Sequence, residues 1–226
     1  MANLNFLLCA TALSLMLGAP AVQAGAWARE KGQYFIALGG NFLLSEGAQL
    51  PVHYDPTLYA EYGWDGHITL GTDIHTADAG RIISGFAFAS VPIGSTEGAN
   101  RFSGQLGFGT LLKQGDDPVY QLRAGLSWGR GLSSGWLSVD GSATITTADK
   151  TFRPKLDATW GHVWSDKWTT TIQLQTGQGT SDDYYAKLAP SVTYDLRSNI
   201  KLHLGAVQAL TGDQGTALKF ETWLTF

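Results

Sequence analysis

The feature that most constrains this chain is the alternation of apolar and polar residues in one segment after another. In residues 119–129, apolar side chains occupy every even position from 120 to 128, whereas Gln121, Arg123 and Ser127 lie at odd positions. Successive side chains of a β-strand point to opposite faces, so this period predicts a strand with one apolar and one polar face. No stretch after residue 24 shows a helical period. The pattern therefore predicts an all-β protein.

Twelve such segments follow one another along the chain, and most have the length of about 9–11 residues that a tilted membrane-spanning strand needs. An even number of strands returns the chain to its starting side, so we predict an antiparallel up-and-down transmembrane β-barrel with both termini periplasmic. In 81–91 two apolar sets of opposite parity compete, one containing Phe86 and the other Ala87. The expected strands are 34–42, 57–64, 67–75, 81–91, 101–112, 119–129, 136–146, 152–163, 168–176, 184–194, 199–209 and 216–226.

Composition favours the membrane over the alternatives. Only 15% of the residues are charged, against about 25% in ordinary soluble domains. The mean hydropathy is close to zero, which excludes a bundle of membrane helices. The net charge of -4 gives no reason to expect nucleic acid as a partner. A soluble barrel or β-sandwich is the remaining alternative, but these folds bury the apolar face inside and usually have fewer strands.

The N-terminal residues have the composition of an export signal. An apolar run covers 4–17, and the stretch 21–24 (Ala-Val-Gln-Ala) has the form of a signal-peptidase site. We therefore expect a cleaved signal peptide at 1–24, a short periplasmic segment at 25–32 and the barrel at 33–226. Residues 1–6 lack Lys and Arg, which leaves a retained anchor helix as an alternative. Cys9 lies in the signal, so the mature chain has no cysteine and no disulfide framework.

Tryptophan marks one end of the expected barrel. All eight tryptophans lie near the connections, or the chain ends, that would face the periplasm. An indole ring has an apolar body and a polar N–H group, so it favours the membrane interface and forms aromatic girdles around barrels. The girdle is predicted to contain Trp64, Trp128, Trp136, Trp160, Trp164 and Trp168.

If the apolar faces contact lipid, the charged side chains of the other parity point into the lumen. The basic ones gather in the later strands, which predicts a pore with a basic wall facing an acidic wall, and such charges set the selectivity of channels. The alternative is a plugged lumen in which these groups pair with one another. Twelve strands lie between the filled barrels of about 8 and the open channels of about 16–18. The lumen set is Arg123, Arg153, Lys155, Lys187, Lys201, Lys219, Glu61, Asp73 and Asp140, with Arg101, Asp157 and Glu221 of the same parity.

The last strand resembles the terminal signal of Gram-negative outer-membrane β-barrels. Lys219, Leu224 and the terminal Phe226 carry this resemblance, although Glu221 stands where a glycine is usual. The resemblance implies a location in the outer membrane, contact with outer-membrane lipids, and recognition by the barrel-assembly machinery. It indicates a porin-like protein without identifying a particular family.

The expected function is a channel for passive passage of small polar or anionic solutes, with no cofactor and no metal. The histidines at 67, 162 and 203 are too scattered for a metal site. The sequence selects neither the solute nor the oligomeric state, and it leaves a structural barrel without transport open.

The alternative from another class is a lipid-modifying hydrolase of the outer membrane. Its histidine would be His53 or His75, near the outer rim, with Ser45, Ser84 or Ser181 as nucleophile. Neither a G-x-S-x-G nor an H-E-x-x-H motif supports this alternative. His53 falls in the longest expected loop, 43–56, which would either fold inward or stand in solvent.

Overall fold

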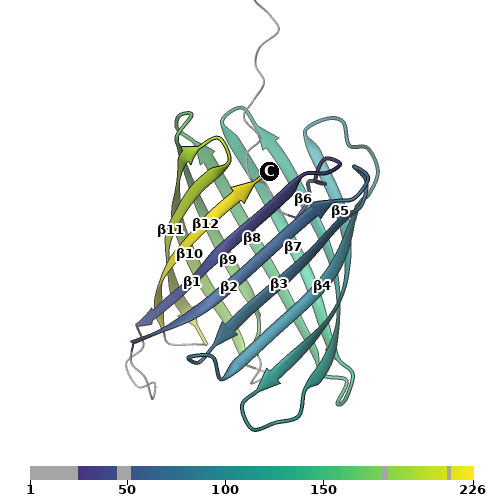
Figure 1. Ribbon diagram of the computed structural model, residues 1–226, viewed down its shortest axis with the longest axis vertical. Helices are drawn as coiled ribbons and strands as arrows, with labels where there is room; N and C mark the ends of the chain where they lie inside the picture. The colour runs from purple at the N-terminus through teal and green to yellow at the C-terminus, as the bar shows by residue number, and fades with distance from the viewer. Residues whose placement is uncertain (1–24, 45–51, 180–182, 213–214) are drawn as a thin grey trace, which may run out of the picture.

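Twelve antiparallel strands close into a barrel in the computed structural model of the chain (Figure 1). The structure describes residues 25–44, 52–179, 183–212 and 215–226. Within these ranges, no helix is long and apolar enough to cross a membrane. The strands are β1 (Tyr34–Leu44), β2 (Val52–Gly63), β3 (Thr69–Ala77), β4 (Ile82–Pro92), β5 (Asn100–Lys113), β6 (Val119–Leu132), β7 (Gly135–Thr146), β8 (Phe152–Val163), β9 (Trp168–Gln178), β10 (Tyr184–Arg197), β11 (Ile200–Thr211) and β12 (Thr216–Thr225).

The barrel closes where its first strand meets its last. Each strand pairs with its neighbours in sequence, and β1 pairs with β12. Tyr34 and Phe226 donate backbone hydrogen bonds to each other, at 2.9 and 3.1 Å. Closure pairs every strand edge, and a sheet embedded in lipid requires this because its backbone groups cannot bond to water. The start of β1 and the end of β12 lie at the upper end in Figure 1, which we call the terminal end, and the opposite end is the distal end. The predicted up-and-down barrel is confirmed.

Apolar side chains cover the outside of the barrel and polar ones line the lumen. On β6, for example, Leu126 is 67% exposed on the outer surface, whereas Gln121 on the inner face is 4% exposed. In a membrane barrel the outward apolar residues contact lipid. Their removal from water lowers the free energy of the folded protein. The predicted alternation is therefore confirmed for this wall of the barrel.

On β4, the parity that the sequence left open is settled by the aromatic residues, which point inward. Phe86 and Phe88 are both buried, while Ala87 faces out. The rings fit because neighbouring strands carry glycine on the inner face. A β carbon on Gly109 would lie 2.6 Å from Phe86 Cδ1, and one on Gly71 would overlap the Phe88 ring. Close packing thus outweighs the tendency of large apolar side chains to face lipid.

The expected loop 43–56 is wrong at both of its ends, which belong to strands, and residues 45–51 lie outside the described residues. β1 continues to Leu44 and β2 begins at Val52. His53 and Asp55 continue the inward face of β2, and the ring of Tyr54 lies 4.7 Å from that of Phe42 on the outside. Pro56 lies within β2, opposite Gly40 of β1, although proline donates no ladder hydrogen bond.

Four of the six tryptophans predicted for the aromatic girdle are exposed at the terminal end of the barrel. The exposed rings there are those of Trp64, Trp160, Trp164 and Trp168, and Trp128 donates a hydrogen bond of 3.3 Å from Nε1 to Oδ1 of Asn100. For Trp136 the prediction is wrong, because this ring is only 6% exposed and packs inside the barrel against Gly161 of β8. Trp136 lies at an even position of β7, on the face opposite to the outward residues, and Gly161 leaves the space that the ring fills.

Candidate functional site: the lumen

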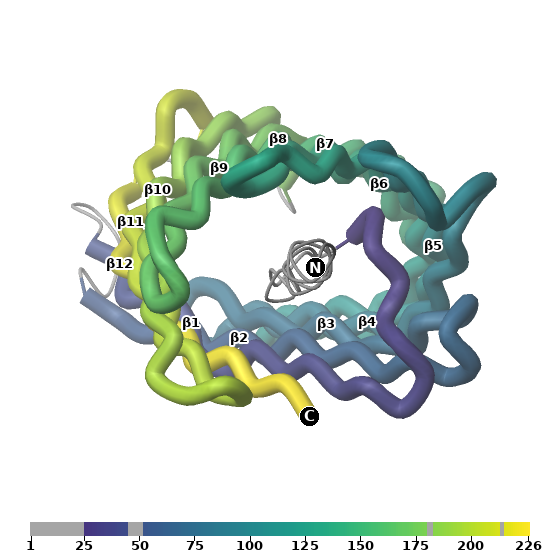
Figure 2. The backbone as a smooth tube through the Cα atoms, turned by 90° about the horizontal axis from the view of Figure 1, so that it is seen from above, coloured from purple at the N-terminus to yellow at the C-terminus, as the bar shows by residue number. Residues whose placement is uncertain are grey.

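The segment 25–32, which we call the strap, runs into the terminal mouth of the barrel. Figure 2 shows it in purple, crossing the inside of the ring toward β6. Ala26 and Arg29 of the strap are both buried. The sequence predicts this segment only as a short piece before the barrel, and nothing in its residue pattern indicates that it enters the lumen.

Arg29 fixes one end of the strap to β1, β2 and β3. Its Nε lies 2.5 Å from Oε2 of Glu61, and both side chains are less than 10% exposed. The guanidinium lies 4.6 Å from the ring centre of Phe35, and the backbone N–H donates to Thr69 Oγ1 at 3.0 Å. Tyr59 donates a further hydrogen bond to Oε1 of Glu61 at 2.5 Å. The carboxylate is thus held from two sides, and the strap is bound to the wall by a buried, charge-assisted contact.

The other end of the strap contacts the opposite part of the ring. The ring of Trp27 lies over Gly129 on β6, where a β carbon would overlap it. Ser103 on β5 donates a hydrogen bond of 2.7 Å to the carbonyl oxygen of Gly25, and Gly25 lies against Asp140 on β7. The strap therefore spans the mouth from β2 to β7 and narrows it.

Deeper in the lumen, four charged side chains form what we call the central charge cluster. Arg123 on β6 reaches Asp73 on β3, with Nη1 and Oδ2 2.7 Å apart, and its guanidinium lies 4.2 Å from the ring centre of Phe86. On the other side, Lys155 and Asp157 of β8 form an ion pair of 2.7 Å. Lys155 and Asp73 are close enough to interact electrostatically. Because β3 and β8 lie on opposite sides of the ring in Figure 2, the cluster lies across the lumen.

The remaining residues of the predicted lumen set are distributed along the inner wall. Lys187 on β10 lies 5.3 Å from the ring centre of Tyr185. Two further pairs are Lys201 with Asp195, at 2.8 Å, and Lys219 with Glu221, at 2.9 Å. Of the other predicted members, Glu61 binds the strap, Asp140 faces the strap, and Arg153 lies near the distal rim. Positive and negative groups thus alternate locally rather than forming one basic and one acidic wall.

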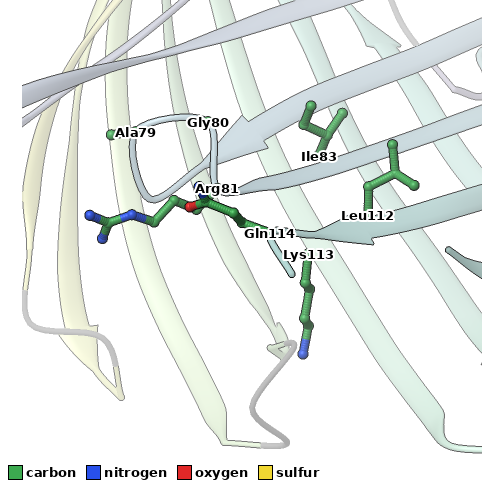
Figure 3. Close-up of a pocket in the computed structure, with 7 residues that line it drawn as sticks. All are labelled: Ala79, Gly80, Arg81, Ile83, Leu112, Lys113 and Gln114. Carbon is green, nitrogen blue, oxygen red and sulfur yellow. The ribbon is translucent and has the colours of Figure 1, made fainter. Parts of the chain in front are cut away.

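Two hollows lie at the distal rim. The larger, of about 320 Å³, is formed where the β3–β4 turn meets the end of β5. Figure 3 shows Ile83 and Leu112 together on one side of it, with the side chain of Arg81 extending away from them. Arg81 pairs with Asp78, at 3.5 Å. The smaller hollow, of about 110 Å³, includes Lys113 and Arg153. These are shallow features of the rim, separate from the central charge cluster.

The residues considered for catalysis do not form a triad in the described part of the chain. His53 faces the lumen next to Asp55, at 3.4 Å, and His75 is paired in register with Ser84. Ser45 and Ser181 lie outside the described residues. Ser134 and His162 are in contact, at 3.4 Å, on the exposed terminal rim. The described residues also contain no cluster of three or more potential metal ligands.

Comparison with known proteins supports the fold. No family model matches the sequence, and no curated protein matches it. Among solved structures, the KdgM porin in complex with disordered oligogalacturonate has a TM-score of 0.63 at 12% identity, over 85% of this chain and 99% of that one. A second structure of the KdgM porin has a TM-score of 0.60 at 14% identity, with the same coverage.

An active-site mutant of outer membrane phospholipase A from Escherichia coli is also similar in fold. It has a TM-score of 0.51 at 8% identity, over 90% of this chain and 93% of that one. At these identities the likeness concerns the fold alone, because one barrel architecture carries both transport and catalysis. The protein has the closed β-barrel fold that these outer-membrane proteins share.

Proposed function

We propose that the protein is an outer-membrane channel through which small polar or anionic solutes pass passively. The observation that carries the proposal is the central charge cluster, in which Arg123, Lys155 and two carboxylates project from opposite walls into the lumen. Charged side chains at a constriction select ions by sign, since they replace part of the hydration of the passing solute.

The preference for anions is supported by two of the lumen ion pairs, in which the lysine is more exposed than its carboxylate partner. In the pair on β8, the side chain of Lys155 is 48% exposed and that of Asp157 is 15% exposed. In the pair on β12, Lys219 is 30% exposed and Glu221 is 9% exposed. A solute in the lumen therefore meets these ammonium groups before it meets their carboxylates. The complex of the KdgM porin with oligogalacturonate, an acidic sugar chain, agrees with this proposal.

The strap supports the limit to small solutes. It crosses the terminal mouth and is held there by the buried Arg29–Glu61 pair, so the free cross-section at this end is smaller than that of the bare ring of strands. We expect a low conductance compared with wider porins.

The test is single-channel conductance of the folded protein in planar bilayers, with a salt gradient to read selectivity. We expect stepwise conductance with a preference for anions. The double variant Lys187→Glu and Lys219→Glu is expected to move the reversal potential toward cation preference. Lys167→Glu is the matched control, because this exposed lysine lies in the β8–β9 turn outside the lumen.

Two results would refute the proposal. A correctly folded barrel without conductance would mean a plugged lumen, and the hydrolase alternative would then be examined with a phospholipid substrate. An unchanged reversal potential in the double variant would remove the role of the lumen lysines.

A further inference from the structure

Asp140 on β7 carries a carboxylate oxygen that the described chain leaves without a partner. Its Oδ1 is buried from solvent and has no hydrogen-bond partner among the described residues. Asp157 of β8 lies directly opposite in the register, and its Oδ2 is already paired with Lys155. Like charges directly opposite each other on neighbouring strands repel, and a buried carboxylate needs a compensating cation. Among the described residues, these two carboxylates thus share one lysine.

The main chain of Gly25 lies against this carboxylate. Gly25 has φ of +78°, a conformation that glycine adopts readily, and a β carbon on it would overlap Oδ1 of Asp140. The same added carbon would lie 3.1 Å from Oγ of Ser127. The carbonyl oxygen of Gly25 is held by Ser103 at 2.7 Å. The backbone of the strap is therefore held by β5 and lies next to the Asp140 oxygen that has no hydrogen-bond partner among the described residues.

The predicted signal-peptidase site would place a cation at this point. Cleavage adds water across the Ala24–Gly25 peptide bond, which leaves a carboxylate on Ala24 and an amine on Gly25 that takes up a proton. We propose that in the mature protein the α-ammonium group of Gly25 forms an ion pair with Asp140 inside the lumen and fastens the strap across the mouth. Before cleavage, the same nitrogen is an uncharged amide with one hydrogen, so the ion pair is created by processing.

The proposal gives the strap two charged anchors on opposite parts of the ring. Arg29 binds Glu61 on β2, and the α-ammonium of Gly25 binds Asp140 on β7, with Trp27 packed between them against Gly129. Hydrogen bonds between charged groups are shorter and stronger than those between neutral groups. The inference rests on the predicted cleavage site and on the geometry around Gly25, and it does not depend on whether the barrel conducts.

The test uses the protein as it is exported and purified from the outer membrane. Its intact mass determines whether the mature chain begins at Gly25. The rate at which an amine-reactive reagent modifies the α-amine is then measured between pH 6 and pH 10, by mass spectrometry of the N-terminal peptide. An ion pair holds the amine in its unreactive charged form to higher pH. The charged groups facing it are Asp140, Asp157 and Lys155.

We expect wild-type protein to react at least about tenfold more slowly at pH 8 than the denatured chain, with the pH profile displaced to higher pH. In Asp140→Asn the displacement is expected to disappear while the protein stays folded on a gel that separates folded from unfolded barrels. The matched control Asp166→Asn, in the exposed β8–β9 turn, should keep the wild-type profile.

The proposal is overturned by either of two results. One is a mature chain that begins at another residue, and the other is a pH profile that is the same in wild type and Asp140→Asn. A second pair of proteins, refolded with Gly25 first or with one added serine before it, keeps the test valid if Asp140→Asn does not fold. The added serine moves the α-ammonium group away from Asp140 by one residue and should abolish the displacement of the pH profile. If the amine reacts as slowly as expected but the barrel does not conduct, the proposed channel function is refuted and the ion pair is not.

Discussion

Replacing Arg29 with methionine is expected to destabilise the barrel strongly, although the residue lies outside the strands. Methionine keeps much of the length of the side chain and removes only the guanidinium. The Glu61 carboxylate would then remain in a site where its side chain is 5% exposed, with the hydroxyl of Tyr59 still donating a hydrogen bond to it.

The magnitude follows from the burial of the pair. Removing one partner of a buried ion pair costs about 3–5 kcal/mol, because the other charge stays desolvated. We take the lower limit, since Tyr59 still donates to the carboxylate, so the expected loss is about 3 kcal/mol, or roughly 150-fold in the unfolding equilibrium. Glu61→Gln alone should cost a similar amount. The double variant Arg29→Met and Glu61→Gln removes both charges and is expected to lie within about 1 kcal/mol of wild type.

The assay is urea-induced unfolding of the refolded protein in detergent, followed by the gel mobility that distinguishes folded from unfolded barrels. The four proteins form a double-mutant cycle, which isolates the coupling between the two side chains. Lys31→Met is the matched control, because Lys31 belongs to the same strap and is exposed. Additive losses in the double variant, or a single Arg29→Met loss no larger than that of the control, would show that the buried pair does not hold the strap.

Three further predictions test other parts of the structure. Gly129→Val places a side chain where the Trp27 ring lies, so we expect the strap to leave the lumen, a loss of about 1–3 kcal/mol, and faster proteolysis of the strap. Arg123→Gln leaves the Asp73 carboxylate without its guanidinium, so the reversal potential in a salt gradient should move toward cation preference. The backbone N–H groups of two turn residues donate to Asp65, which lowers its pKa. The ionised Asp65 therefore stabilises the fold fully above its pKa in the unfolded chain, about 3.9, and this stabilisation is lost as the pH falls through its lower pKa in the folded protein. In that acidic range, hydrogen exchange of the β2–β3 turn should accelerate in wild type but not in Asp65→Ala.

The architecture was accessible from the sequence because lipid contact imposes a strict rule on each strand by itself. On β6, outward apolar residues such as Leu126 alternate with inward polar residues such as Gln121, and this pattern does not depend on the neighbouring strands. The rule fails where a neighbouring strand offers space inside. Phe86 and Phe88 turn inward over glycines of β3 and β5, and no pattern within β4 records those glycines. Trp136 is a similar case, since Gly161 on β8 decides its direction.

The lining of the lumen was predicted by residue type, but its pairing was not. Parity places Lys155 and Lys219 on the inner face, yet it carries no information about distance along the wall. Each of them reaches a carboxylate two residues further along the same strand. The strap was missed for a related reason, because its contacts are made by a buried arginine and by backbone atoms near Gly25, which leave no periodic signal.

Local pairing changes what the charges in the lumen do. A basic wall facing an acidic wall would create a field across the whole pore, whereas close pairs form short dipoles whose fields fall off faster with distance than those of single charges. Selectivity then depends on which end of each dipole faces the water. On β8 and β12 that end is the lysine, while Arg123 is less exposed than its partner Asp73. Lys155→Gln should therefore shift the reversal potential more than Lys201→Gln does, because Lys201 is buried more deeply than its partner Asp195. Equal responses to the two substitutions would mean that net charge, and not the orientation of the pairs, determines selectivity.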